Sequence, residues 1–270
     1  MIEIFPIPAF ADNYIWCLRQ PNSVQVVLVD PGDKRVIDTL QRRRLQPVAI
    51  LITHQHVDHV GAVQVLLDQF PQLDVYGPAQ ATVAEPRFGP EMPIPDLIQH
   101  TLREGNRIRI DAIDTEFQVF DLPGHTLDHI GYYGAGALFC GDTLFACGCG
   151  RIMGGDAEHF VDSLQKIRRL PADTQIYCAH EYTLDNIGFA RWVEPDNPVL
   201  LQRDEDDMAK QERGTPTVPS SLQLEMNSNP FLRFDQPGVI RAAEQYRGKK
   251  LASAVDVFAA IRDWKDLEYD

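Results

Sequence analysis

The sequence predicts an α/β protein with a smaller, all-helical region towards its C-terminal end. Apolar runs rich in β-branched residues alternate with amphipathic stretches up to His180, which is the pattern of strands and helices around a sheet. Beyond His180 such runs are few, and charged helix-like stretches occupy 199–213 and 237–262. Several expected strands also end in a histidine or an aspartate, which is how α/β folds place a site on a rigid sheet.

Composition narrows the class of protein. With 270 residues the chain can bury a substantial core, as one large or two ordinary domains. Its net charge of −14 argues against nucleic acid and against an anionic membrane as partners, because both need a basic surface. An anionic small-molecule substrate would therefore have to find a local basic patch.

Two features bear on the cellular location. The opening residues, Met1 to Pro6, carry an acid but neither a basic cluster nor a long apolar run, so we expect no signal peptide and no membrane span. The five cysteines are an odd count without the regular spacing of a disulfide framework, in agreement with a reducing compartment. We expect a cytoplasmic protein that acts as a monomer.

The chain is expected to begin with three strands and a helix. The strands are expected at 2–8, 14–18 and 24–29, and the helix at 35–44. Between them Asp30-Pro31-Gly32-Asp33 forms a turn. Aspartates commonly flank Pro-Gly turns for structural reasons, so we interpret Asp30 and Asp33 as turn residues, although both could line a site.

The stretch Thr53-His54-Gln55-His56-Val57-Asp58-His59 is the most informative part of the sequence. It follows an apolar strand expected at 47–52 and precedes an amphipathic helix expected at 60–70, so it occupies a strand-to-helix turn. Neutral imidazole and carboxylate are the usual ligands of zinc and related divalent ions. We therefore interpret the stretch as part of a metal site, rather than as an exposed polar turn.

The spacing within this stretch suits two metal ions. In an extended segment His54 and His56 point to the same side. Asp58 and His59, at the mouth of the following helix, can turn towards a second point nearby. One short loop can thus feed two ions, and the rest of the chain must supply the remaining ligands.

Three later strands also present ligand-type side chains. Strands expected at 117–122, 137–140 and 175–179 are followed by His125, Asp142 and His180. Each residue alone is more typical of a structural role, but together they complete a ligand set. The expected ligands are, for one ion, His54, His56 and His125, for the other ion, Asp58, His59 and His180, and as the bridge Asp142. The remaining histidines at 100, 129 and 159 are interpreted as surface or supporting residues.

Other expected elements connect these segments. They are a strand at 73–77, a proline-rich surface loop at 84–97, a hairpin formed by 130–133 and 137–140, a helix at 159–170 and a linker at 215–221.

Taken together, these motifs resemble those of a known family. The stretch 53–59 is similar to the THxHxDH signature of the metallo-β-lactamase superfamily, which hydrolases, nucleases and sulfur dioxygenases share. Narrower motifs resemble glyoxalase II, the hydroxyacylglutathione hydrolases, and lie at 7–16, 141–145, 148–151, 179–183 and 229–233. The resemblance therefore covers nearly the whole chain. It implies an αββα metallo-β-lactamase sandwich with a smaller C-terminal all-helical domain.

The resemblance also implies an activity. The expected reaction is hydrolysis of S-D-lactoylglutathione, or another S-2-hydroxyacylglutathione, to D-lactate and glutathione, the second step of methylglyoxal degradation. Two divalent ions are implied, most simply zinc, with iron or manganese as alternatives. A metal-bridging hydroxide would attack the thioester with Asp58 and Asp142 orienting it, and no side-chain nucleophile is needed. We place the metal-binding catalytic domain at 1–173 and a helical substrate-binding domain at 174–270.

The family's substrate contacts carry over to Arg151, Tyr182 and Arg233, which are expected to hold the glutathione moiety. Met153 stands where many relatives have a tyrosine, and 234–236 offers no second basic residue where many relatives have one. Two other functions are weighed against this one. A glutathione persulfide dioxygenase of the same superfamily would use one iron and would not need the second-metal ligands. A non-catalytic, metal-stabilised binding protein would instead favour a closed, cysteine-rich site.

Overall fold

A computed structural model describes residues 2–79 and 94–270 of the chain. The described chain packs as two units, of which the first comprises Met1–Asp121 and Asp128–Gly141. The second comprises Leu122–Leu127 and Asp142–Asp270. The domain boundary predicted between 173 and 174 stays a prediction.

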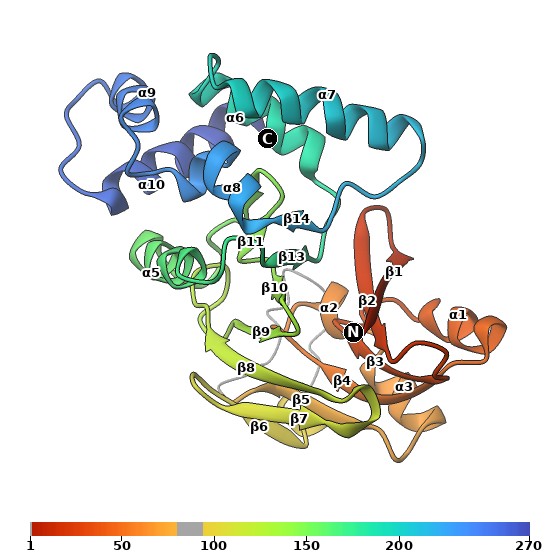
Figure 1. Cartoon of the computed structure of the whole chain (residues 1–270). Coiled ribbons are helices and arrows are strands. Elements are labelled where there is room, and N and C mark those ends of the chain that lie inside the picture. The colour runs from red at the N-terminus through yellow and green to blue at the C-terminus, as the bar shows by residue number, and fades with distance from the viewer. Residues whose placement is uncertain (1, 80–93) are drawn as a thin grey trace. The chain divides into compact units, whose positions relative to one another are not determined.

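The first unit contains a mixed sheet in the strand order β1-β2-β3-β4-β5-β6 (Figure 1). Its strands are β1 (Glu3–Ala9), β2 (Asn13–Arg19), β3 (Gln25–Val29), β4 (Gln46–Leu51), β5 (Asp74–Pro78) and β6 (His100–Leu102). The first three strands pair antiparallel, and β3 to β6 pair parallel. Parallel neighbours need crossover connections: α1 (Val36–Arg43) connects β3 to β4, and α2 (Val57–Val60) and α3 (Val63–Gln69) connect β4 to β5.

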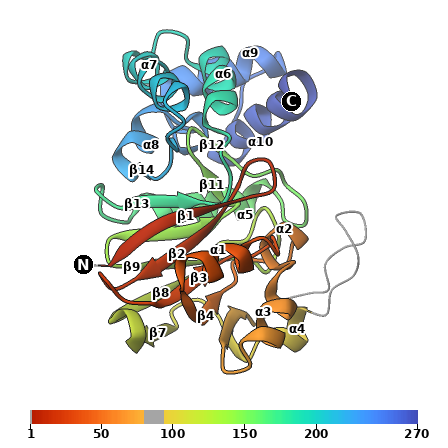
Figure 2. The same cartoon turned by 90° about the vertical axis from the view of Figure 1, so that its right-hand side faces the viewer.

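These helices cover one face of the sheet (Figure 2). Val26 and Leu28 lie two apart on β3, so both point to the helical side. They share one buried cluster with Val36 and Leu40, which lie four apart on α1 and therefore on one helical face. The apolar faces of β3 and α1 therefore pack in a single core, which also includes Ile50 of β4, the strand that leads to the histidine cluster.

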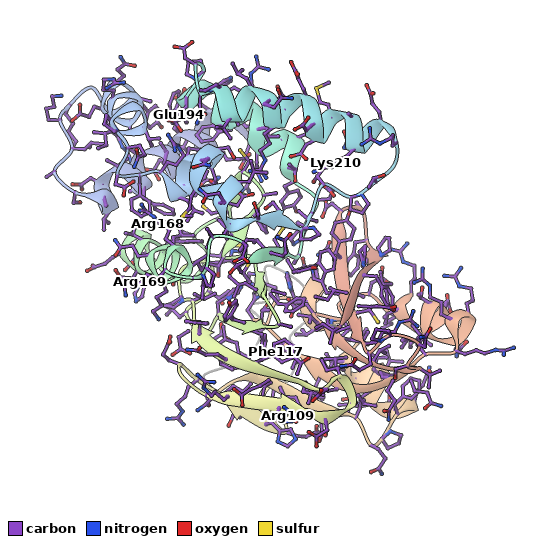
Figure 3. All side chains as sticks on the ribbon, viewed as in Figure 1. Arg109, Phe117, Arg168, Arg169, Glu194 and Lys210 are labelled. Carbon is purple, nitrogen blue, oxygen red and sulfur yellow. The ribbon has the colours of Figure 1, made fainter. Side chains whose placement is uncertain are left out.

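The part of the second sheet that lies in the first unit runs β10-β9-β8-β7 and is antiparallel throughout. Its strands are β7 (Arg107–Ile110), β8 (Thr115–Asp121), β9 (Ile130–Gly134) and β10 (Ala137–Gly141), with the 3₁₀ turn Asp111–Ile113 between β7 and β8. Phe117, labelled in Figure 3, is fully buried. It packs edge-to-face on Phe139, with ring centroids 6.3 Å apart. The strand that precedes Asp142 is therefore anchored in an aromatic core.

The second unit is mainly helical. It contains α5 (Ala157–Arg168), α6 (Thr183–Val193), α7 (Pro198–Glu212), α8 (Leu222–Ser228), α9 (Pro237–Arg247) and α10 (Ala254–Trp264). Two short antiparallel pairs accompany them, β11 (Leu144–Phe145) with β12 (Gly148–Cys149) and β13 (Gln175–Cys178) with β14 (Ser220–Ser221). Single turns occur at Pro230–Leu232 and Lys265–Tyr269.

Aromatic rings form the core of this unit. Phe258 of α10 stacks on Phe160 of α5 at 5.3 Å and meets Phe231 edge-to-face at 5.8 Å. Phe231 stacks in turn on Phe189 of α6 at 6.0 Å. Burying such rings is strongly favourable, so they join helices that are distant in the sequence.

The expected strands and helices of the first 180 residues are confirmed to within a residue or two at most ends. The helix expected at 60–70 starts earlier and is divided into α2 and α3. The stretch 237–262 is two helices, because Gly248 takes a left-handed conformation with φ 65° after α9 and Ser253 caps α10. The end of the expected linker 215–221 forms β14.

Some expectations fall outside this agreement. Residues 84–93 of the expected loop lie outside the described residues, and Ile94–Leu97 forms the short helix α4 instead of loop. The strands β6 and β7 and the helices α6 and α8 were not foreseen. Within the described ranges, no helix combines the length and apolar character needed to cross a membrane.

Candidate metal centre

The histidine cluster follows β4 directly and leads into α2, as the sequence predicts. His54, His56 and His59 are all buried. His54 Nε2 lies 3.0 Å from His56 Nδ1, and the rings of His54 and His59 are 4.0 Å apart. Three buried imidazoles held this close together offer nitrogen ligands of the kind that bind zinc and related ions.

Asp30 orients two of these imidazoles. Its carboxylate accepts hydrogen bonds from the backbone N–H of Thr53 at 2.8 Å, from Thr53 Oγ1 at 2.7 Å and from His59 Nδ1 at 3.0 Å. The single O–H hydrogen of Thr53 is donated to Asp30, so the Thr53 oxygen is left to accept the Nδ1–H of His54 at 3.1 Å. In both histidines Nε2 becomes the nitrogen with the lone pair, which is the form that binds a metal.

Sequence reasoning missed this role of Asp30. The residue was interpreted as part of a Pro-Gly turn, and it does sit in one, with φ 51°. The signal that could have found it is positional: Asp30 follows β3, which pairs parallel with β4, so both strands deliver their next residues to the same sheet edge.

Asp58 is positioned from two sides. Asn13 Nδ2 donates to Asp58 Oδ2 at 3.0 Å. On the other side the turn at Gly32 packs against the Asp58 backbone, and a Cβ on Gly32 would lie 1.7 Å from the Asp58 carbonyl oxygen. Glycine is therefore required at 32, because any side chain would push the Asp58 loop away. Asn13 belongs to the family motif 7–16, and in this structure its role is to hold the Asp58 carboxylate by a hydrogen bond.

His125, Asp142 and His180 form a second set of ligand-type residues. All three are buried, and one carboxylate oxygen, Asp142 Oδ2, lies 3.5 Å from Nε2 of both His125 and His180. His125 Nδ1 donates to the carbonyl of Arg151 at 2.8 Å, so its Nε2 also carries the lone pair. A carboxylate placed equally between two imidazoles is arranged as a bridging ligand would be.

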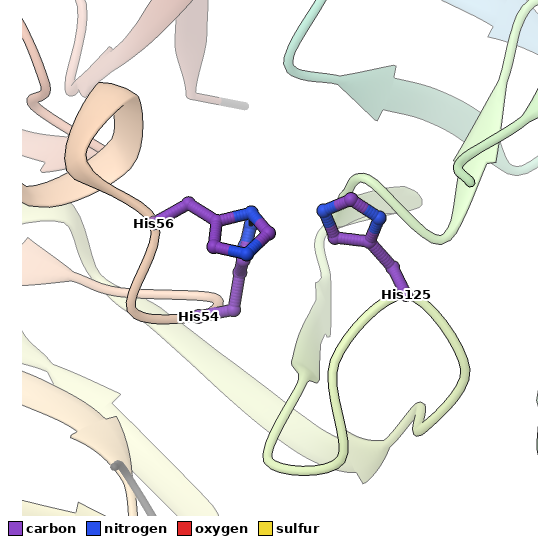
Figure 4. A group of neighbouring side chains, drawn as sticks. All are labelled: His54, His56 and His125. Atoms are coloured by element: carbon purple, nitrogen blue, oxygen red, sulfur yellow. Dashed lines mark hydrogen bonds between the residues drawn. The ribbon is translucent and has the colours of Figure 1, made fainter. Parts of the chain in front are cut away.

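The structure brings the seven predicted ligands together in three groups, in each of which one ligand atom per residue lies within 4.8 Å of the others. The groups are His54, His56 and His125, then Asp58, His59 and His180, and finally His54, His59 and Asp142. Figure 4 shows the His54, His56 and His125 rings turned towards one another. The donors are imidazole and carboxylate, which fit zinc, iron or manganese. The first two groups match the two predicted ion sites, and the third joins Asp142 to a residue of each.

The other predicted residues have varied surroundings. His129 is buried, and its ring stacks on His54 at 4.7 Å, in keeping with a supporting role. His100 and His159 are exposed and pair with Asp74 and Asp156.

The three residues predicted to contact glutathione differ in the contacts that their side chains already make within the protein. The Tyr182 ring stacks on His180 at 4.7 Å. The side chain of Arg151 is 59% exposed and pairs with Asp270 at 3.1 Å. Arg233, in contrast, is held by Glu194 and by the Met226 carbonyl. Its role in substrate binding stays a prediction, as do the roles of Arg151 and Tyr182.

Known protein families and solved structures were compared with this chain. Residues 18–180 match the family model "Metallo-beta-lactamase superfamily", and residues 181–267 match "Hydroxyacylglutathione hydrolase C-terminus". Among solved structures, ETHE1 from Myxococcus xanthus is similar with a TM-score of 0.65 at 21% identity, covering 100% of this chain and 93% of that one. The BLEG-1 B3 metallo-beta-lactamase gives a TM-score of 0.62 at 25% identity, over 86% of this chain and 99% of that one.

Curated relatives of similar sequence indicate the family within this superfamily. The hydroxyacylglutathione hydrolase of Nitrosomonas europaea is 48% identical over 98% of this chain and 96% of its own length. That of Pseudomonas fluorescens is 42% identical over 98% of this chain and 99% of its own. The chain therefore belongs to the metallo-β-lactamase superfamily and, within it, to the hydroxyacylglutathione hydrolase family.

Proposed function

We propose that this protein hydrolyses S-2-hydroxyacylglutathiones, with S-D-lactoylglutathione as the main substrate and D-lactate and glutathione as products. The observation that carries the proposal is the position of Asp142 Oδ2, at 3.5 Å from both His125 and His180 in a chain of this family. This reaction is the second step of methylglyoxal degradation.

The seven residues of the three groups would hold two divalent ions, with zinc as the first choice and iron or manganese as alternatives. Such a pair of ions supplies Lewis acidity and hydroxide at neutral pH. Asp58 and Asp142 would be ligands of these ions and would orient the attacking hydroxide. Because a thiolate leaves more readily than an amine, Asp58 need not serve as a strong general acid.

The cysteines support a mechanism without a thiol nucleophile. Burial raises the pKa of Cys149 to about 11, with Arg262 opposing the rise, and raises those of Cys147 and Cys178 to about 12. All three thiols are therefore neutral at pH 7, and only the thiolate is a competent nucleophile. The remaining two cysteines, Cys17 and Cys140, are also buried and are not joined in a disulfide.

Arg151, Tyr182 and Arg233 are proposed to contact the glutathione moiety. Arg151 presents an exposed guanidinium, which suits a substrate carboxylate in a protein of strongly negative net charge. Arg233 already donates through Nε, Nη1 and Nη2 to protein acceptors. Since a guanidinium has five N–H groups, two remain for a substrate. We also propose a monomer in the cytoplasm, where free cysteines stay reduced.

The test is steady-state hydrolysis of S-D-lactoylglutathione beside elemental analysis of the same sample. The proposal expects thioester turnover that depends on bound metal. An oxygen electrode with glutathione persulfide examines the dioxygenase alternative. Oxygen uptake without thioester hydrolysis would replace the proposed function, and metal binding without either reaction would leave a binding protein.

A further inference from the structure

A short hairpin follows Asp142 in the second unit. Its strands β11 and β12 have two residues each and share only the pairs Leu144 with Cys149 and Phe145 with Gly148. Cys147, in the turn, has φ 59°, a left-handed conformation that a non-glycine residue adopts at some cost. So short a hairpin cannot hold this conformation unaided, because isolated two-stranded ribbons are at best marginally stable.

Buried side chains from other elements hold the hairpin by its backbone. The bonds are Asn229 Nδ2 to the carbonyls of Phe145 (3.2 Å) and Gly148 (2.9 Å), Asn186 Nδ2 to that of Ala146 (3.1 Å), Cys147 N–H to Glu225 Oε2 (2.8 Å) and Arg262 Nη1 to the carbonyl of Cys149 (3.1 Å). Each of the five consecutive residues 145–149 is thus bound. The four side chains come from α6, α8, the residue after α8, and α10.

Glu225 is the charged centre of this arrangement and is fully buried, at 0% exposure. Arg203, at 2% exposure, donates to Glu225 Oε1 at 2.7 Å, and Asn229 Nδ2 lies 3.0 Å from Oε2. Ser220 donates to the same carboxylate. A buried charge is tolerated when it is paired and its remaining lone pairs are satisfied, and such a network favours one geometry over others.

The hairpin bears directly on Asp142. Asp142 precedes β11 by two residues, and at the other end of the hairpin Gly150 packs on the Asp142 backbone. A Cβ on Gly150 would lie 2.1 Å from the Asp142 carbonyl oxygen and 3.0 Å from Nδ1 of His125. Displacement of the hairpin would therefore move two of the proposed ligands.

We propose that Asn186, Glu225, Asn229 and Arg262 are positioning residues that fix Asp142 through the β11–β12 hairpin. The inference rests on the proposed function, because it takes Asp142 as a metal ligand. It assigns the helices a second task beside substrate contact: they hold the backbone that carries the bridging carboxylate.

The test compares Asn229→Ala with Asn227→Ala. Asn227 lies nearby on α8, and its side chain accepts an exposed hydrogen bond from Gln223 at 3.3 Å, away from the hairpin backbone. Both variants are loaded by dialysis against zinc at fixed free concentrations and analysed for bound metal. Samples loaded with Mn²⁺ are examined by electron paramagnetic resonance, which distinguishes a coupled pair from isolated ions.

We expect Asn229→Ala to bind one of its two ions about 10-fold more weakly, because disturbing groups that orient ligands costs this order of affinity. Its Mn²⁺ spectrum should show isolated ions, and kcat should fall while KM changes little. Asn227→Ala should match the parent in every readout. A folded Asn229→Ala protein with parental affinity for both ions and a coupled spectrum would overturn the proposal.

Circular dichroism establishes that each variant is folded. If Asn229→Ala does not fold, Asn186→Ala removes a single bond to the hairpin and should show a smaller loss in the same direction. Parental metal binding in Asn186→Ala would then count against the proposal. None of the metal readouts uses a substrate, so a protein that binds both ions but fails to hydrolyse the thioester would disprove the proposed function alone.

Discussion

Arg233 and Glu194 form a bidentate ion pair, with Nε 2.7 Å from Oε2 and Nη2 3.0 Å from Oε1. Glu194 follows the last residue of α6 (Figure 3), and Arg233 follows the turn 230–232. Arg233 also donates to the carbonyl of Met226 in α8 at 3.1 Å. The arginine of the family motif therefore joins two helices, whatever it contributes to substrate binding.

This pair predicts that Arg233→Ala lowers stability. Glu194 is 9% exposed and would lose a charged partner, which costs about 1.5–3 kcal/mol. Urea unfolding measures the loss of stability, and Glu194→Gln should cause a comparable loss.

If Arg233 also binds glutathione, only Arg233→Ala should raise KM for S-D-lactoylglutathione. A small thioester without the glutathione carboxylates should then be hydrolysed equally by parent and variant, and an equal loss on it would contradict the binding role.

Asp142→Ala is expected to cost far more activity than Cys149→Ala. The carboxylate lies beside two proposed ligands, whereas burial keeps the Cys149 thiol neutral. Steady-state kinetics on metal-replete samples gives the comparison. If Cys149→Ala lost activity as completely as Asp142→Ala, the thiol would have a chemical role and the mechanism would need revision.

Two metal ions per chain are expected, because two of the ligand groups have no residue in common and the third joins Asp142 to one histidine of each. Dialysis against a chelator should abolish hydrolysis, and added zinc should restore it. Elemental analysis beside the activity assay gives the count. A fully active preparation with one ion or none would exclude the dinuclear site.

Asp30→Asn should weaken metal binding although the residue is not a proposed ligand. The amide would place N–H donors where Thr53 Oγ1 and His59 Nδ1 now donate to a carboxylate. His59 would then carry its proton on Nε2 and lose its lone pair towards the metal. Affinity should fall about 10- to 100-fold. Zinc titration measures it, with the exposed Asp38→Asn on α1 as a control that should behave as the parent.

Asp33 should make stability depend on pH in the acid range. Burial would raise its pKa, but hydrogen bonds from the Arg35 side chain and from the backbone N–H groups of Phe10 and Arg35 outweigh this effect and lower the pKa from 3.8 to about 2. A carboxyl with a lowered folded-state pKa stabilises the fold above the unfolded-state pKa. The stabilisation is lost as pH falls from about 4 to about 2, and it amounts to roughly 2 kcal/mol.

The measurement is urea unfolding of the parent and of Asp33→Asn at a series of pH values. The parent should be more stable at pH 6, and the difference should shrink as the pH falls through the acid range. A difference that stays constant with pH would mean that the charge of Asp33 does not stabilise the turn.

Local patterns predicted much of the fold and the candidate site. Strand ends that deliver ligand-type residues are visible in the sequence, because a buried strand and the polar residue after it are adjacent in the chain. The tasks of Asp30, Asn13 and Glu225 were not visible. Each depends on a partner far along the chain, as Asn13 on Asp58, and such pairings exist only after the sheets and helices have packed. Short helices such as α8, with seven residues, also carry too little periodicity to be found.

The buried cysteines have a consequence for the redox environment in which this protein is proposed to work. An enzyme that releases glutathione operates among low-molecular-weight thiols and their disulfides. Thiol–disulfide exchange begins with an accessible thiolate. Burial raises the pKa of Cys17, Cys147 and Cys178 to about 12, so these residues offer no thiolate to oxidised glutathione. These three residues can therefore remain free of mixed disulfides while released glutathione accumulates around the protein.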